Sequence, residues 1–193
     1  MKEERLEIKC FVCNPYMQNT YVVHQPERKE CLIIDAGMYE AEEEQAVAEY
    51  IREKQLQVTA VLITHSHPDH ICGKEWIKQT YPTAQVVDYS YLKNLTREHE
   101  PELHYADMTI RCLFTPGHKE DCVCYYLPES GILFSGDTLF RQSVGRTDLP
   151  GGDYGTLIDS LHYLMELPEE TKVYPGHSDP TTIGYERKYN PYV

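Results

Sequence analysis

Residues 64–73, THSHPDHICG, concentrate three histidines and one aspartate at the point where an expected strand gives way to an expected helix. The stretch follows VTAVLI at 58–63, an apolar and β-branched run that is typical of a buried strand. Side chains two positions apart on a strand point the same way, so His65 and His67 can converge on one point. Such dense histidine use at a strand end is typical of a metal site.

Pro68 turns the chain within the same stretch. Proline stops a strand and its fixed φ suits the first turn of a helix, so Asp69 and His70 can be aimed at a second point beside the first. Imidazole and carboxylate are ligands of zinc, iron and manganese, whereas calcium and magnesium sites are dominated by oxygen. The stretch therefore predicts two adjacent sites for transition-metal ions.

Three further candidate ligands each lie at the end of an expected strand and beside a glycine. They are His118 in TPGH, Asp137 in SGDTLF and His177 in VYPGH. Taken singly, a histidine after a Pro-Gly turn or an aspartate that caps the next segment is as readily structural as functional. Taken together, they supply the ligands that the first stretch lacks.

The composition is that of an ordinary globular protein, with 41% hydrophobic and 25% charged residues in a length of 193. We expect one domain over residues 1–193 with a mixed α/β fold, in which hairpins occur beside crossovers. Residues 140–153 are expected to form a loop that can touch substrate. Helices are expected at 41–54, 69–80 and 154–167, and strands at 6–12, 20–24, 31–35, 58–64, 85–87, 108–114, 122–127, 132–135 and 172–174.

Charge and cysteine content limit the partners and the compartment. The formal charge of -13 repels polyanions, so we expect no nucleic acid partner. The first residues lack the apolar stretch of a signal peptide and no run is long enough to cross a bilayer, so we expect no membrane contact and a cytoplasmic location. Seven cysteines, with spacings as short as that of Cys10 and Cys13, suit reduced thiols. The sequence says nothing of oligomeric state.

In the order and spacing of THSHPDH, TPGH, SGDTLF and PGH, the sequence resembles the metallo-β-lactamase superfamily, and more narrowly its small glyoxalase II-like hydrolases. GRTDLPGGD and TTIGYERKYNPY add to the likeness, which covers nearly the whole chain. The resemblance implies a four-layer αββα sandwich with mixed sheets. It places His65, His67 and His118 on one metal ion, Asp69, His70 and His177 on the other, Asp137 as a bridge, and Asp35 as a support of the metal loops.

The implied chemistry is hydrolysis. Two divalent ions, zinc by preference with iron or manganese also open, leave a net charge of about plus one after Asp69, Asp137 and a hydroxide are counted, which favours a small anionic substrate. Metal lowers the pKa of bound water to about 7, so a hydroxide that Asp69 helps to orient can attack a polarised carbonyl. We expect cleavage of a thioester such as S-lactoylglutathione. Arg146 is a candidate to hold a substrate carboxylate, with Asp148 orienting it; an exposed ion pair is an equal alternative.

The chain departs from its relatives after two ligands, with Lys119-Glu120-Asp121 after His118 and Ser178-Asp179-Pro180 after His177. The sequence ends at Val193, so we expect no counterpart of the additional C-terminal helical domain that binds glutathione in full-length glyoxalase II, and glutathione recognition is not carried over. A persulfide dioxygenase with a single iron shares most of these ligands and stays open. So do a lactonase or β-lactamase and a non-catalytic metal-binding module, while the negative charge disfavours a nuclease.

Overall fold

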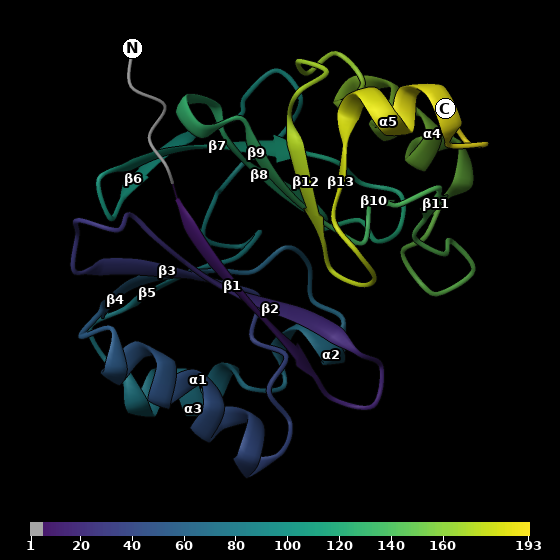
Figure 1. Cartoon of the computed structure of the whole chain (residues 1–193). Helices are drawn as coiled ribbons and strands as arrows, with labels where there is room; N and C mark the ends of the chain where they lie inside the picture. The colour runs from purple at the N-terminus through teal and green to yellow at the C-terminus, as the bar shows by residue number, and fades with distance from the viewer. Residues whose placement is uncertain (1–5) are drawn as a thin grey trace.

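The computed structural model describes residues 6–193, in which two stacked β-sheets lie between two layers of helices (Figure 1). The first sheet has five strands in the order β1-β2-β3-β4-β5, and the second has six in the order β13-β12-β9-β8-β7-β6. The strands of the first sheet are β1 (Glu7–Cys13), β2 (Gln18–His24), β3 (Glu30–Ile34), β4 (Gln57–Leu62) and β5 (Gln85–Val87). Those of the second are β6 (Glu102–Tyr105), β7 (Met108–Phe114), β8 (Val123–Leu127), β9 (Ile132–Gly136), β12 (Lys172–Pro175) and β13 (Thr181–Thr182).

Both sheets are mixed. In the first, β1, β2 and β3 pair antiparallel, while β3, β4 and β5 are parallel. In the second, β12 runs parallel to β9 and every other pairing is antiparallel. A small ribbon of β10 (Leu139–Phe140) and β11 (Ser143–Val144) and a short 3-10 helix, η1 (Pro128–Ser130), complete the β-rich part.

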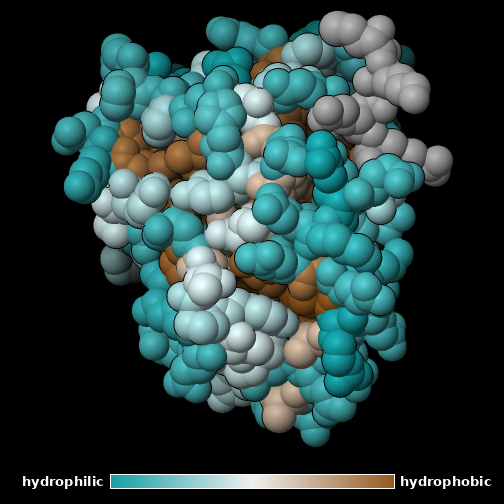
Figure 2. Space-filling model, turned by 90° about the vertical axis from the view of Figure 1, so that its left-hand side faces the viewer, coloured by the Kyte–Doolittle hydropathy of each residue, from teal (hydrophilic) through white to brown (hydrophobic). Residues whose placement is uncertain are grey.

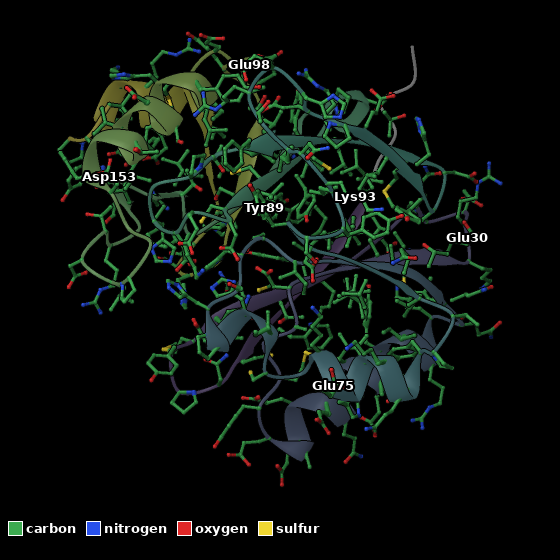
Figure 3. All side chains as sticks on the ribbon, turned by 180° about the vertical axis from the view of Figure 1, so that it is seen from behind. Glu30, Glu75, Tyr89, Lys93, Glu98 and Asp153 are labelled. Atoms are coloured by element: carbon green, nitrogen blue, oxygen red, sulfur yellow. The ribbon has the colours of Figure 1, made fainter. Side chains whose placement is uncertain are left out.

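The helices form the two outer layers. Below the first sheet in Figure 1 lie α1 (Ala41–Glu53) and α3 (Lys74–Thr80), with α2 (Pro68–Ile71) at the sheet's end. The second sheet is covered by α4 (Tyr154–Leu164) and α5 (Ile183–Tyr189). Asp153 caps α4 by accepting a hydrogen bond from Thr156 N at 2.7 Å, and Figure 3 marks it at the start of that helix. The expected four-layer αββα sandwich is thereby confirmed.

Three apolar clusters hold the layers together, and strand alternation divides the residues among them. On β2, Tyr21 and Val23 face the other sheet, whereas Val22 between them packs under α1 with Val47. A third cluster lies between the second sheet and α4, and includes Leu161. Because both faces of these strands are buried, their sequences are nearly continuous hydrophobic runs rather than alternating ones.

The structure differs from the sequence expectation where elements are short. The helix expected over 69–80 is two helices, because the chain turns at Gly73, whose N–H donates to Ala36 O at 2.8 Å. A Cβ at Gly73 would stand 3.0 Å from both Met38 Cε and Met38 O, so a larger residue would fit there only if its neighbours shifted. The strands β6, β10, β11 and β13 and the helix α5 were not expected; with two to seven residues each, they carry too little periodicity to detect.

No helix formed by residues 6–193 is both long and apolar enough to cross a bilayer. On the face shown in Figure 2, hydrophilic side chains cover most of the surface and the apolar ones lie mainly in recesses between them. All seven cysteines are free thiols; Cys13 packs under α1, whereas Cys10 is exposed. The two therefore do not form a metal-binding pair.

Candidate metal centre

The structure brings together all seven candidate ligands at one edge of the sandwich. His65, His67, Asp69 and His70 follow β4, and the others lie in the loops after β7, β9 and β12. Their donor atoms form three overlapping groups, each within 4.8 Å: His65, His67 and His118; His65, His70 and Asp137; Asp69, His70 and His177. The first and third groups are the two ligand sets that the family resemblance implies.

The first group consists of three imidazoles whose ring nitrogens face one another. His67 Nδ1 lies 3.1 Å from His65 Nε2 and 2.8 Å from His118 Nε2. The ring centroids of His65 and His118 are 4.8 Å apart at an angle of 87°. Three nitrogens converging on one point form the nitrogen-rich donor set that zinc or iron accepts.

The third group, Asp69, His70 and His177, adds a carboxylate, and Asp137 lies between it and the first group. Asp69 Oδ2 lies 3.2 Å from His177 Nε2 and 3.6 Å from His70 Nε2. Asp137 contacts both groups, because its Oδ1 is 3.3 Å from His70 Nε2 and its Oδ2 is 3.6 Å from His118 Nε2. This is the position of a carboxylate that can bridge two ions.

Two buried ligand atoms that lack a hydrogen-bond partner indicate whether these residues suit a metal ion. His70 Nε2 and Asp137 Oδ1 are buried and have no hydrogen-bond partner within the described chain. An unsatisfied buried polar atom is costly, and a metal ion between the two would satisfy both. The donor set therefore fits a metal ion chemically as well as geometrically.

The electrostatics of the group also suit ligation. Burial and the neighbouring histidines hold the pKa of His65 well below its ordinary value, so that its imidazole is neutral at neutral pH. Burial alone would raise the pKa of Asp137, but the charges of His70 and His177 outweigh burial and lower it. His65 and Asp137 are thus in the protonation states in which these groups bind metal. Burial lowers the pKa of His70 and of His177, but the neighbouring carboxylates outweigh burial and raise both, so a metal ion would displace a proton from these two ligands.

A second set of contacts orients the ligands. His70 Nδ1 donates to Asp35 Oδ2 at 2.8 Å, and Asp35 Oδ1 accepts from Thr64 N at 2.7 Å. His118 Nδ1 donates to Arg146 O at 2.7 Å, and His177 Nδ1 to Tyr16 O at 3.0 Å. Each contact fixes the tautomer and turns the opposite ring nitrogen toward the centre. Asp35 thus lies where the resemblance implies a supporting residue.

Two glycines allow the loops to approach the ligands. A Cβ at Gly176 would stand 2.3 Å from Asp137 Oδ1, and one at Gly145 would stand 1.9 Å from Asp137 O. Neither distance is possible for a real side chain, so both positions require glycine on steric grounds. The Pro-Gly pair before His177 is therefore part of the site.

Arg146 lines a cavity of about 380 Å³ over the ligands. Arg146 makes two hydrogen bonds of 2.6 Å to Asp148, and both side chains are exposed. These contacts lower the pKa of Asp148 to about 2. The pair is formed as expected, while its contact with substrate remains a prediction.

Sequence reasoning missed the hairpin between β1 and β2. Asn14 Nδ2 donates to Asp69 O at 2.9 Å, and Tyr16 lines the cavity with its carbonyl on His177, 161 residues away in the chain. Nothing local in NPYMQ indicates these contacts, because they depend on how the hairpin meets the end of β12, where Asn19 N of β2 donates to Gly176 O at 2.7 Å. The positive φ values of Asn14 and Met17, 53° and 57°, shape the turn.

Comparison with known proteins agrees with this geometry. The family model described as the metallo-beta-lactamase superfamily matches residues 13–106 and 113–177, and the chain belongs to that superfamily. A probable metallo-hydrolase, YqgX of Bacillus subtilis, is 32% identical, over 93% of each chain. A hydroxyacylglutathione hydrolase of Francisella tularensis subsp. novicida is 37% identical over 67% of this chain, but the match covers only 53% of that relative.

Among solved structures, the BLEG-1 B3 metallo-beta-lactamase has a TM-score of 0.86 at 33% identity, covering 96% of this chain and 99% of that one. ETHE1 from Myxococcus xanthus has a TM-score of 0.84 at 30% identity, covering 96% and 83%. TTHA1623, solved in a di-iron-bound form, has a TM-score of 0.80 at 29% identity, covering 96% and 100%. These likenesses establish the class of the chain, a metallo-hydrolase-like enzyme fold, and leave its substrate open.

Proposed function

We propose that this chain is a metal-dependent hydrolase that cleaves an acyl thioester. The observation that carries the proposal is the assembly of two complete ligand sets that share Asp137. Two ions, zinc by preference with iron or manganese open, would be held by His65, His67 and His118 on one side and by Asp69, His70 and His177 on the other. The likeness to a hydroxyacylglutathione hydrolase supports the thioester.

The residues around the ligands indicate how the reaction would proceed. Bound metal supplies Lewis acidity, which activates water at neutral pH and polarises a carbonyl. Asp69, whose Oδ2 is at the edge of the cavity beside His177, can accept a hydrogen bond from the attacking water and orient it. The water oxygen bonds to the acyl carbon, the C–S bond breaks, and a proton passes to the departing thiolate. No nucleophilic serine or cysteine is needed.

Substrate charge follows from the same site. The two ligand sets contain two carboxylates and five imidazoles, so two divalent ions leave a local excess of positive charge despite the overall charge of -13. A small anionic substrate is therefore favoured. Arg146 can add to this attraction only to the extent that Asp148 leaves its guanidinium free.

The test is hydrolysis by the zinc-loaded protein of a panel of acyl thioesters, which includes S-lactoylglutathione, read by release of the free thiol. We expect turnover that disappears in His118→Ala. A protein that retains its metal and hydrolyses none of the thioesters would refute the proposal.

A second candidate function, that of a persulfide dioxygenase, is favoured by the likeness to ETHE1 at 30% identity. A persulfide dioxygenase would hold one iron and consume oxygen with glutathione persulfide. The complete second set, Asp69, His70 and His177, argues for two ions instead. One iron per chain together with oxygen uptake on glutathione persulfide would select the dioxygenase.

The likeness to a B3 metallo-beta-lactamase makes β-lactams and lactones a third class to assay. These substrates would use the same ligands and water, and they differ only in what the cavity accepts. Comparative kcat/KM on thioesters, lactones and β-lactams separates the three activities.

A further inference from the structure

A larger cavity, of about 560 Å³, opens beside His177 on the side away from Arg146. Its floor is the inner face of β1, where Ile8, Cys10 and Val12 alternate with residues that face α1. The register places these three opposite Val23, Tyr21 and Asn19 of β2. In a closed sandwich this face would be covered, yet Val12 is 55% exposed. We call this cavity the β1 groove.

The walls of the β1 groove are mostly apolar. Besides the β1 residues, the groove is lined by Tyr174 of β12, by Pro180 just before β13, and by Tyr21 of β2. Asp179 is the acidic side chain among the described residues that line it. An open apolar groove that leads to a metal centre can bind an extended, mostly uncharged chain, and a carboxylate midway can accept N–H groups.

A second cavity of about 290 Å³ adjoins the β1 groove, because Tyr174 and Pro180 line both. Lys172 and Arg141 both line the second cavity. Within residues 6–193 neither cation is paired with a carboxylate, whereas Arg146 is bound to Asp148. The guanidinium of Arg141 lies 5.2 Å from the centroid of the Tyr185 ring, which holds it in place.

Arg141 and Lys172 lie at the far end of the mostly apolar β1 groove, in a chain whose net charge is -13. This pair of cations is suited to bind an anionic group of a ligand. We propose that the β1 groove takes the thiol-derived arm of the substrate, and that Arg141 and Lys172 bind a phosphate at the arm's far end, as in a coenzyme A thioester. The inference rests on the proposed thioester hydrolysis and adds the class of thiol.

The distance from the metal centre to Lys172 favours a phosphopantetheine arm over glutathione. The stretch 172–177 leads from Lys172 to His177 and, if extended, spans about 17 Å at a rise of about 3.3 Å per residue. A tripeptide arm extends about 10 Å, and its two carboxylates and ammonium group would lie against apolar walls. A phosphopantetheine arm is longer, is uncharged between sulfur and phosphate, and carries amide N–H groups for Asp179.

Binding of non-hydrolysable thioethers to the zinc-loaded protein tests the proposal by calorimetry. S-methyl-coenzyme A should bind at least about 10-fold more tightly than S-methylpantetheine, which lacks the phosphates. In Arg141→Gln/Lys172→Gln the two ligands should bind equally. The variant Arg52→Gln/Lys78→Gln removes the same charge from exposed positions on α1 and α3 and should keep the preference.

Equal binding of the two ligands by the unchanged protein, or a preference that survives in Arg141→Gln/Lys172→Gln, would overturn the inference. Tighter binding of S-methylglutathione would overturn it as well. Because these are binding measurements, they stand apart from the thioester assays: a protein that hydrolyses thioesters without this preference refutes the coenzyme A inference alone. A protein that hydrolyses none refutes the proposed function.

Discussion

His70 donates from Nδ1 to Asp35 Oδ2 at 2.8 Å, and both side chains are almost wholly buried. The Asp35 carboxylate also accepts from the backbone N–H and the hydroxyl of Thr64, the residue just before the first histidine. One carboxylate thus joins the end of β3 to the ligand loop after β4. The φ of Asp35 is 59°, a strained value that its fixed contacts maintain.

We therefore expect Asp35→Asn to lower metal affinity by about 10- to 100-fold, because an amide cannot accept from both His70 and Thr64 as the carboxylate does. The free energy of unfolding should fall by about 1–3 kcal/mol. Competition with a metal chelator and thermal unfolding measure the two effects. Asp159→Asn, at an exposed position on α4, is the control, and equal metal affinity in the two variants would contradict the role of Asp35.

Gly176→Ala tests the steric argument at the metal centre. The added Cβ would lie 2.3 Å from Asp137 Oδ1 and 2.6 Å from His70 Cε1, so the ligands must shift. We expect a loss of metal affinity of at least about 10-fold and a stability cost of about 1–3 kcal/mol. Metal content after dialysis and chemical unfolding report on these separately.

Gly155→Ala provides the matched control for that substitution. Gly155 is in α4, and the nearest atom to an added Cβ is Asp153 Oδ1 at 3.5 Å. Replacing a helical glycine by alanine should raise stability by up to about 1 kcal/mol and leave metal binding unchanged. If both variants retain full metal affinity, the close approach at Gly176 does not matter for the site.

Much of the site could be predicted from local sequence, because its geometry is local. Alternation on a strand places His65 and His67 on one side, and Pro68 redirects the next two ligands; neither inference needs the rest of the fold. His118 and His177 are different. His177 joins the site because β12 lies beside β9 in the second sheet, a pairing between segments about 40 residues apart. His118 joins it because the start of β8, just after its loop, meets the ligand stretch after β4, where Val123 N donates to Thr64 O at 2.8 Å. For both residues the sequence evidence was their collective order and the family resemblance.

The β1 groove shows what local pattern could not supply. Alternation on β1 predicts an inner face with Ile8, Cys10 and Val12, which an ordinary sandwich would bury. That face stays open because of where the second sheet ends, at the short strand β13. The positions of Tyr16 and Arg141 likewise depend on tertiary contacts of short turns, which carry no periodic signal.

Asp148 should titrate at an unusually low pH. Hydrogen bonds from Arg146 lower its pKa to about 2 from its ordinary value of 3.8. A carboxyl with a depressed folded-state pKa stabilises the fold above its unfolded value, and this contribution disappears as the pH falls through about 2. Because the pair is exposed, its effect on stability at neutral pH should be small. Carboxyl NMR chemical shifts followed against pH measure the midpoint directly.

In Arg146→Gln the midpoint of Asp148 should return toward 3.8. Asp153, whose pKa is lowered by hydrogen bonds from Thr156 instead, should keep its low value and serves as the internal control. A midpoint near 3.8 for Asp148 in the unchanged protein would mean that the guanidinium is not bound to it in solution. Arg146 would then be free to meet a substrate carboxylate.

Metal stoichiometry tests the arrangement of ligands itself. The unchanged chain should hold two ions after loading and desalting, measured by elemental analysis. His118→Ala removes a nitrogen from one ligand set and His177→Ala from the other, so each variant should lose one ion and keep its partner. Asp137→Asn should weaken the binding of both ions, since Asp137 Oδ1 lies 3.3 Å from His70 Nε2 and Asp137 Oδ2 lies 3.6 Å from His118 Nε2. His104→Ala, at an exposed position outside the site, should retain both ions. If the unchanged chain holds one ion, and His177→Ala does not alter that number, the second ligand set binds no metal and the hydrolytic assignment loses its structural basis.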